Sequence, residues 1–135
     1  MTDLSFNGNT APLVVLVNGE SRLEYDRSKE LSERQRVYLD RMDRQMDSGI
    51  RLGTDWVEQP RLAQRASFVA AQLVDALQRD DEALIAACCT YLANRLPELK
   101  QIKARLLTVG FSVELVFDKP YVEEITVDFV PRPPS

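Results

Sequence analysis

Helical spacing dominates the middle of the chain. Between residues 62 and 107, apolar residues recur every three or four positions, which keeps one face of a 3.6-residue helix apolar. The run is interrupted at Arg79-Asp80-Asp81 and at Pro97. We therefore predict three helices, the first beginning at Leu62, the second at Asp81-Glu82 and the third at Pro97-Glu98.

The ends of these helices carry typical signals. Asp80 or Asp81 can accept hydrogen bonds from the free N–H groups of the second helix and oppose its dipole. Pro97 suits a first turn, because proline has no N–H to donate, and Gly110 is placed to close the third helix. The expected apolar stripe of that third helix is Leu99, Ile102, Leu106 and Val109. The second helix is apolar on nearly all sides, so we expect it to be the central one.

A fourth helix precedes them. Ser32-Glu33-Arg34-Gln35 has the form of a capping box, and Leu39, Met42, Met46 and Ile50 make an apolar stripe behind it. Gly49 or Gly53 can end this helix. Residues 51–59 are predicted to form a loop around Trp56.

Both ends of the chain show strand patterns. Asn18-Gly19 lies between Leu13–Val17 and Glu20–Tyr25, which predicts a hairpin with a two-residue turn. In that register Val14, Leu16, Leu23 and Tyr25 share the face toward the helices, while Leu13, Val15 and Val17 lie on the other face. A second hairpin is predicted from Phe111–Phe117 and Ile125–Phe129, whose apolar residues alternate.

These elements predict an α+β fold in the order ββααααββ. The N- and C-terminal hairpins join into one antiparallel sheet, and about four helices cover one face of it. A single domain is expected over residues 1–135, with a flexible lead-in at 1–11 and a Pro-rich tail at 131–135. In the alternative arrangement, the hairpins pair with a second copy of the chain and form a homodimer.

Composition narrows the partners and the chemistry. The chain has 21 acidic and 17 basic residues and a net charge of −4, which argues against nucleic acid as the main partner. Arg95, Lys100, Lys103 and Arg105 form the nearest basic patch, but no aromatic residues are interleaved with them. Neither a membrane span nor a signal peptide is recognisable, so the expected location is cytoplasmic, without a membrane partner.

The chain contains no histidine, which removes the usual general base, the Ser/His and Cys/His pairs and the commonest zinc ligand. The catalytic residues are therefore unknown, and no cofactor is expected. Cys88 and Cys89 are adjacent in the most apolar helix, where we expect two buried thiols without a disulfide.

Three aspartates on the first predicted helix are the weak candidates for a metal site. Asp40, Asp43 and Asp47 are spaced by three and four residues, so Mg²⁺ can in principle bridge them. Asp40 to Arg44 and Asp47 to Arg51 are, however, i,i+4 ion pairs, which favours a solvated charged stripe over a metal site.

Two functions from different classes follow. The first is a non-enzymatic protein-interaction or regulatory module that binds a protein partner or itself, with Leu13, Val15, Val17 and Trp56 as interface candidates. The alternative is a small enzyme or a ligand- or metal-binding domain. Its acidic carboxylate site would draw on Glu20, Glu24, Asp26, Asp40, Asp43 and Asp47.

Overall fold

The computed structural model describes residues 11–119, and its largest element is a four-stranded sheet in the order β2-β1-β5-β6. The strands are β1 (Leu13–Val17), β2 (Glu20–Tyr25), β5 (Gln101–Leu106) and β6 (Phe111–Val116). Pairing is antiparallel between β1 and β2 and between β5 and β6, but it is parallel between β1 and β5. The sheet is therefore mixed, and the predicted antiparallel-only sheet is wrong.

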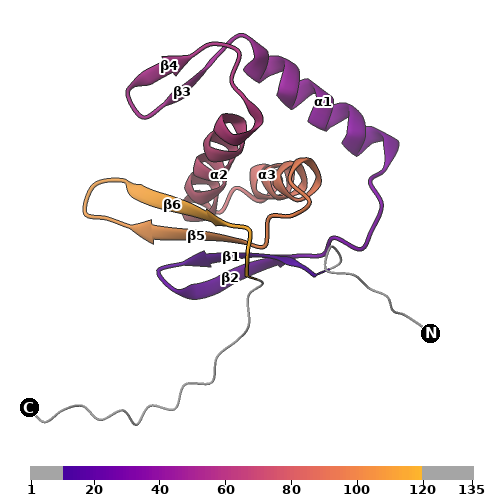
Figure 1. Ribbon diagram of the computed structural model, residues 1–135. Coiled ribbons are helices and arrows are strands. Elements are labelled where there is room, and N and C mark those ends of the chain that lie inside the picture. Colours follow the sequence, from indigo (N-terminus) through magenta and orange to yellow (C-terminus); the bar gives the residue numbers. More distant parts are fainter. Residues whose placement is uncertain (1–10, 120–135) are drawn as a thin grey trace, which may run out of the picture.

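Residues 11–119 also contain three helices: α1 (Glu33–Asp47), α2 (Leu62–Arg79) and α3 (Glu82–Arg95). Helices α2 and α3 cover one face of the sheet, and α1 lies outside them, further from the four-stranded sheet (Figure 1). Beside α1 is a short hairpin of β3 (Ile50–Leu52) and β4 (Asp55–Val57), in the region predicted to be a loop. The α+β class is confirmed, with three helices in place of about four.

The predicted helix after Pro97 is wrong, because this segment forms β5. Ile102, Ala104 and Leu106 alternate toward the helices, while Gln101, Lys103 and Arg105 point to the opposite face. Pro97 follows the end of α3, and the cap residue Leu96, with ψ of 78°, is outside the helical region that a following proline disfavours. Gly110, expected to close a helix, lies in the β5–β6 turn with φ of +83°.

Several helix ends are confirmed. At α1, the backbone N–H of Gln35 donates to Ser32 Oγ (3.1 Å), and the N–H of Ser32 donates to Gln35 Oε1 (2.8 Å). At α3, the N–H of Leu84 donates to Asp81 Oδ1 (3.2 Å). Asp80 takes the left-handed conformation at the end of α2, with φ of 56°. The sharp α2–α3 connection therefore follows from its two aspartates.

The β1–β2 hairpin is confirmed, and Leu23 and Tyr25 face the helices as predicted, but the predicted faces of β1 are wrong. Val17 pairs with Glu20 and Leu16 with Ser21, and then a bulge shifts the register so that Val15 pairs with Leu23. The extra residue in β2 is Arg22, and it brings Leu23 and Tyr25 onto the face of Leu13 and Val15. Leu13, Val15 and Val17, rather than Val14 and Leu16, therefore face the helices.

The second hairpin is formed by β5 and β6, with Ile102 opposite Leu115 and Ala104 opposite Val113. Residues 111–116 thus take the predicted strand conformation with a partner that precedes them in the chain. The predicted strand 125–129, the Pro-rich tail and residues 1–10 of the lead-in lie outside the described residues. None of the helices between residues 11 and 119 has the length and apolarity that a membrane span requires.

Candidate functional site

The three aspartates of α1 are joined to the other two helices by ion pairs. Asp43 is the centre: it accepts hydrogen bonds from Tyr91 Oη (2.6 Å), Arg95 Nε (2.9 Å) and Arg65 Nη1 (3.2 Å). Asp40 pairs with Arg95 (3.0 Å), and Asp47 pairs with Arg65 (2.7 Å). The partners come from α2 and α3, so pairs between helices replace the expected i,i+4 pairs Asp40–Arg44 and Asp47–Arg51.

This ion-pair network changes the chemistry of its members. Burial alone would raise the pKa of Asp43, but hydrogen bonds from Tyr91 and Arg95 and the charge of Arg95 hold it below the ordinary 3.8. Burial and the Asp43 carboxylate raise the pKa of Tyr91 above its ordinary value. Arg95 also lies over the Tyr91 ring, 5.8 Å from its centroid. Asp43 therefore stays ionised near neutral pH and its oxygens are occupied.

The six carboxylates of the acidic-site hypothesis do not converge. Glu20 and Glu24 are exposed on β2, and Asp26 accepts hydrogen bonds from the N–H and the hydroxyl of Ser28 (2.9 and 2.7 Å). This group lies at the edge of the sheet, whereas α1 is on the far side of α2 and α3 (Figure 1). No cluster of three or more His, Cys, Asp or Glu suited to a metal ion occurs within residues 11–119.

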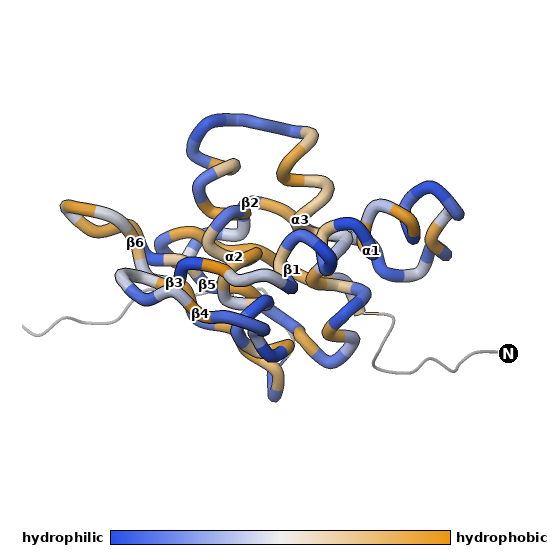
Figure 2. The backbone as a smooth tube through the Cα atoms, turned by 90° about the horizontal axis from the view of Figure 1, so that it is seen from above, coloured by the Kyte–Doolittle hydropathy of each residue, from blue (hydrophilic) through white to orange (hydrophobic). Residues whose placement is uncertain are grey.

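The three aspartates of α1 pair with Arg65 and Arg95, which leaves the arginines of α1 without these partners on the outward face, beside the exposed Glu33. Arg34, Arg41 and Arg44 are exposed there, and none has an acidic partner within 4.0 Å in the described part of the chain. Between them lie two exposed apolar side chains, Val37 (43% exposed) and Tyr38 (41% exposed). In Figure 2, α1 lies at the margin of the molecule and is coloured largely hydrophilic.

A groove runs beside this face, between the first halves of α1 and α3. Its volume is about 370 Å³. Arg34, Tyr38 and Leu39 line it from α1, and Ala83, Ala86, Ala87 and Thr90 line it from α3. The small side chains of α3 leave space that larger residues would fill. The direct contacts between α1 and α3 described above are at the other end of the groove, in the ion-pair network. The α1–α3 groove is mostly apolar and open to solvent.

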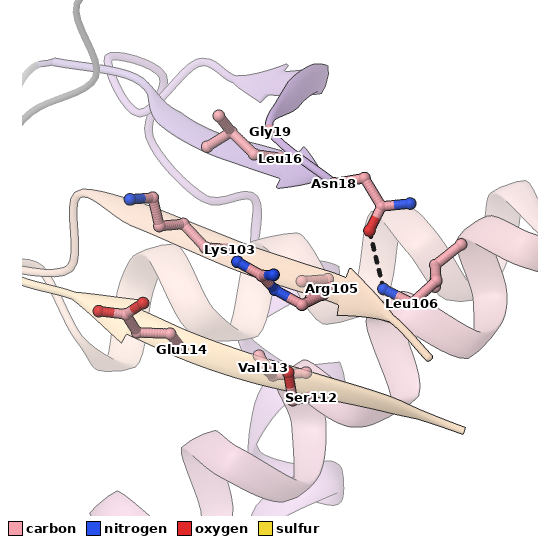
Figure 3. A pocket seen from close by; sticks show the side chains of 10 residues that line it. Leu16, Asn18, Gly19, Lys103, Arg105, Leu106, Ser112, Val113 and Glu114 are labelled. Atoms are coloured by element: carbon pink, nitrogen blue, oxygen red, sulfur yellow. Dashed lines mark hydrogen bonds between the residues drawn. The ribbon is translucent and has the colours of Figure 1, made fainter. Parts of the chain in front are cut away.

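The open face of the sheet has a larger hollow, of about 620 Å³. Leu16 from β1, Lys103 and Arg105 from β5, and Glu114 from β6 lie side by side there (Figure 3). Asn18 closes one end, where its Oδ1 accepts a hydrogen bond from the N–H of Leu106 (2.9 Å). The charges are of both signs and solvent-exposed, so the hollow favours no ligand class.

The interface candidates fall into two groups. Leu13, Val15 and Val17 are buried in the core beneath the helices, so they offer no surface to a partner. Trp56 is 56% exposed on β4, and its indole ring lies over Gly49. Cys88 and Cys89 are buried free thiols, and burial raises the pKa of each to about 12. These thiols are therefore neutral and unreactive near neutral pH.

Sequence reasoning missed the basic and apolar face of α1. Arg34, Tyr38 and Arg41 are spaced by four and three residues, which is itself a helical stripe. It was hidden by the aspartates interleaved with it, because their pairing with α2 and α3 is a tertiary feature.

Comparisons with protein-family models, with curated proteins and with solved structures give no match to this chain. Its function therefore has to be argued from its own geometry.

Proposed function

We propose that this protein is a non-enzymatic interaction module that binds a helical segment of a protein partner in the α1–α3 groove. The observation that carries the proposal is the groove itself, an apolar channel of about 370 Å³ with exposed Tyr38 on its rim and Val37 beside it. A helix lays its apolar face into such a channel, and tyrosine and arginine are common anchors of interfaces.

The surrounding structure supports a preformed site. The network of Asp43, Tyr91, Arg65 and Arg95 fixes α1 against α2 and α3 at one end. The capping box of Ser32 and Gln35 ends the helix cleanly at the other. The network therefore holds α1 beside α3 at one end of the groove before a partner arrives, and the capping box keeps the start of α1 helical, which lowers the ordering cost of binding.

The alternative of an acidic catalytic or metal site has less support. The Asp43 carboxylate already accepts three hydrogen bonds, and the pairs of Asp40 and Asp47 with arginines would compete with a cation. The sheet-edge acids lie on the other side of the molecule (Figure 1). Binding of a partner needs none of these groups to change its protonation state.

Site-specific photo-crosslinking tests this function. A benzophenone side chain at position 37, in cells that produce the protein, should give a defined crosslinked species. The same group at the exposed position 22 should not. Replacing Ala86, on the groove floor, by Gln should reduce the species several-fold, whereas Ala63→Gln on the exposed start of α2 should leave it unchanged.

The mass of the crosslinked species also identifies the partner. A product of twice the chain mass would make the partner a second copy, a homodimer formed through the α1–α3 groove and not through the terminal hairpins considered from the sequence. A different protein should bind the purified chain in solution with the same dependence on Ala86. The proposal fails if position 37 gives no species, or if positions 37 and 22 give the same ones.

A further inference from the structure

The acidic and basic side chains of α1 differ in their partners. All three acidic residues between Arg34 and Asp47 pair inward with Arg65 and Arg95. Arg34 and Arg41 stay on the outward side, and neither has an acidic partner within 4.0 Å in the described part of the chain. These two arginines form a short basic strip on α1 of a chain whose net charge is −4: Arg34 lines the α1–α3 groove, and Arg41 lies about two turns further along the helix.

We infer that the partner of the α1–α3 groove is an acidic amphipathic helix, and this inference rests on the function proposed above. Exposed arginines without acidic partners lower the free energy of a bound acidic segment, through bidentate pairs with its carboxylates. Basic partners are disfavoured, because Arg34 and Arg41 would repel them. The partner class follows from charge complementarity and from the apolar floor together.

The spacing on α1 sets the expected pattern on the partner. Arg34 and Arg41 are seven residues apart, which is about 10 Å along a helix. Tyr38 lies between them, next to the alanine floor of Ala86 and Ala87. A helix lying along α1 would match this with two acidic residues seven positions apart and a large apolar residue three or four positions after the first.

Peptide display provides the test. A library of random 16-residue peptides is selected on the full-length chain. Selected peptides should be enriched in that acidic–apolar–acidic pattern. Measured by fluorescence anisotropy, their affinity should fall at least tenfold for the double variant Arg34→Glu/Arg41→Glu and should weaken with added salt. The control Arg22→Glu/Arg51→Glu changes two exposed arginines outside the strip and should stay within twofold.

The outcomes separate the inference from the function beneath it. One outcome is a set of selected peptides that show no excess of acidic residues and still lose binding to the Ala86→Gln variant. That result would support the groove as the binding site and overturn the inference that its partner is acidic. Peptides that bind both variants as well as the native chain, or a selection that yields none, would overturn both proposals. Tighter binding of a 20-nucleotide single-stranded DNA, lost with Arg34→Glu/Arg41→Glu, would replace the acidic helix by nucleic acid.

Discussion

The Asp43 carboxylate is where the polar chemistry of the molecule is concentrated. It draws a phenol and two guanidinium groups together from two other helices. A carboxylate so placed holds elements in position, because its lone pairs are already engaged and its charge is balanced. The residues that resemble a metal site in sequence thus serve as the joint between α1 and the rest of the fold.

Replacing Asp43 by Asn should destabilise the protein by about 2 kcal/mol near pH 7, since three donors lose a charged acceptor. The folded-state pKa of Asp43 is depressed, so its contribution is fully present above the unfolded value and is lost as pH falls through the folded one. Urea unfolding should therefore show a difference in unfolding free energy between the native chain and the variant at pH 7, and this gap should be smaller below pH 4. Asp55→Asn, at an exposed carboxylate on β4, is the control and should show almost no gap. A gap independent of pH would contradict this role.

Gly49 is required by the indole of Trp56. A Cβ at Gly49 would lie within 2.7 Å of three indole atoms, and its φ of +136° already disfavours a side chain. Gly49→Ala should displace Trp56, shift its fluorescence to longer wavelength and destabilise the protein by more than about 1 kcal/mol. Gly53→Ala is a matched control, because Gly53 also has positive φ (+63°) but no atom within 4 Å of its would-be Cβ. Equal effects of the two substitutions would remove the indole contact as the cause.

At the scale of elements, the end of α3 depends on a residue far from it in sequence. Arg27, in the linker after β2, donates to the carbonyls of Ala93 (3.1 Å), Leu96 (2.9 Å) and Leu99. The Ala93 carbonyl lies in the last turn of α3 and has no N–H donor four residues on, because that residue is Pro97, and a cation at a helix C-terminus also opposes the dipole. Burial lowers the pKa of Arg27 from its ordinary value, although the guanidinium remains charged.

Arg27→Met should therefore cost about 2 kcal/mol of unfolding free energy, because a methionine fills similar space without donating. Hydrogen exchange should report faster opening in the last turn of α3 than at its start. Arg22→Met, at the exposed bulge of β2, should stay within about 0.5 kcal/mol of the native chain. Unchanged exchange at the end of α3 would count against this capping role.

Strand β5 was predicted to be a helix because the spacing of its apolar residues fits both kinds of element. Ile102 and Leu106 are four residues apart, a spacing that satisfies both a helix and a strand, and Leu99 and Val109 extend it as a helical stripe. Lys103 and Arg105 alternate with Ala104, which is the strand signal, but the small alanine makes it weak. The caps and the first hairpin were predictable because their signals lie within a few residues. The pairing of β5 with β1 joins distant parts of the sequence and leaves no such local signal.

Point substitutions distinguish a strand from a helix in this segment. Ile102→Ala should cost about 3 kcal/mol, because Ile102 is fully buried opposite Val15 and Leu115. Val109→Ala should cost almost nothing, because Val109 is 87% exposed in the β5–β6 turn, although a helical stripe would have made it a core residue. Denaturant midpoints of the two variants give the comparison. Similar losses at both positions would favour the helix.

At the scale of the whole molecule, the sheet depends on one pairing between strands that are far apart in the sequence. β1 begins the described chain and β5 comes after all three helices, yet they pair in parallel at the centre of the sheet. The N–H of Asn18 donates to the carbonyl of Ala104 (2.8 Å) just beyond the pairing. The helical layer, the network and the groove all depend on this closure, since α2 and α3 cover a sheet made from both hairpins (Figure 1).

A chain shortened to residues 1–98 should therefore fail to fold cooperatively. Without β5, the buried strand β1 has an open edge, and the core loses Leu99 and Ile102, both fully buried. Adding a peptide of residues 99–119, which contains β5 and β6, should restore a sharp thermal transition and near-ultraviolet circular dichroism. The same peptide with Ile102→Ala should restore them only at higher concentration. A cooperative transition of the 1–98 chain by itself would show that the helices and the first hairpin fold without the parallel pairing.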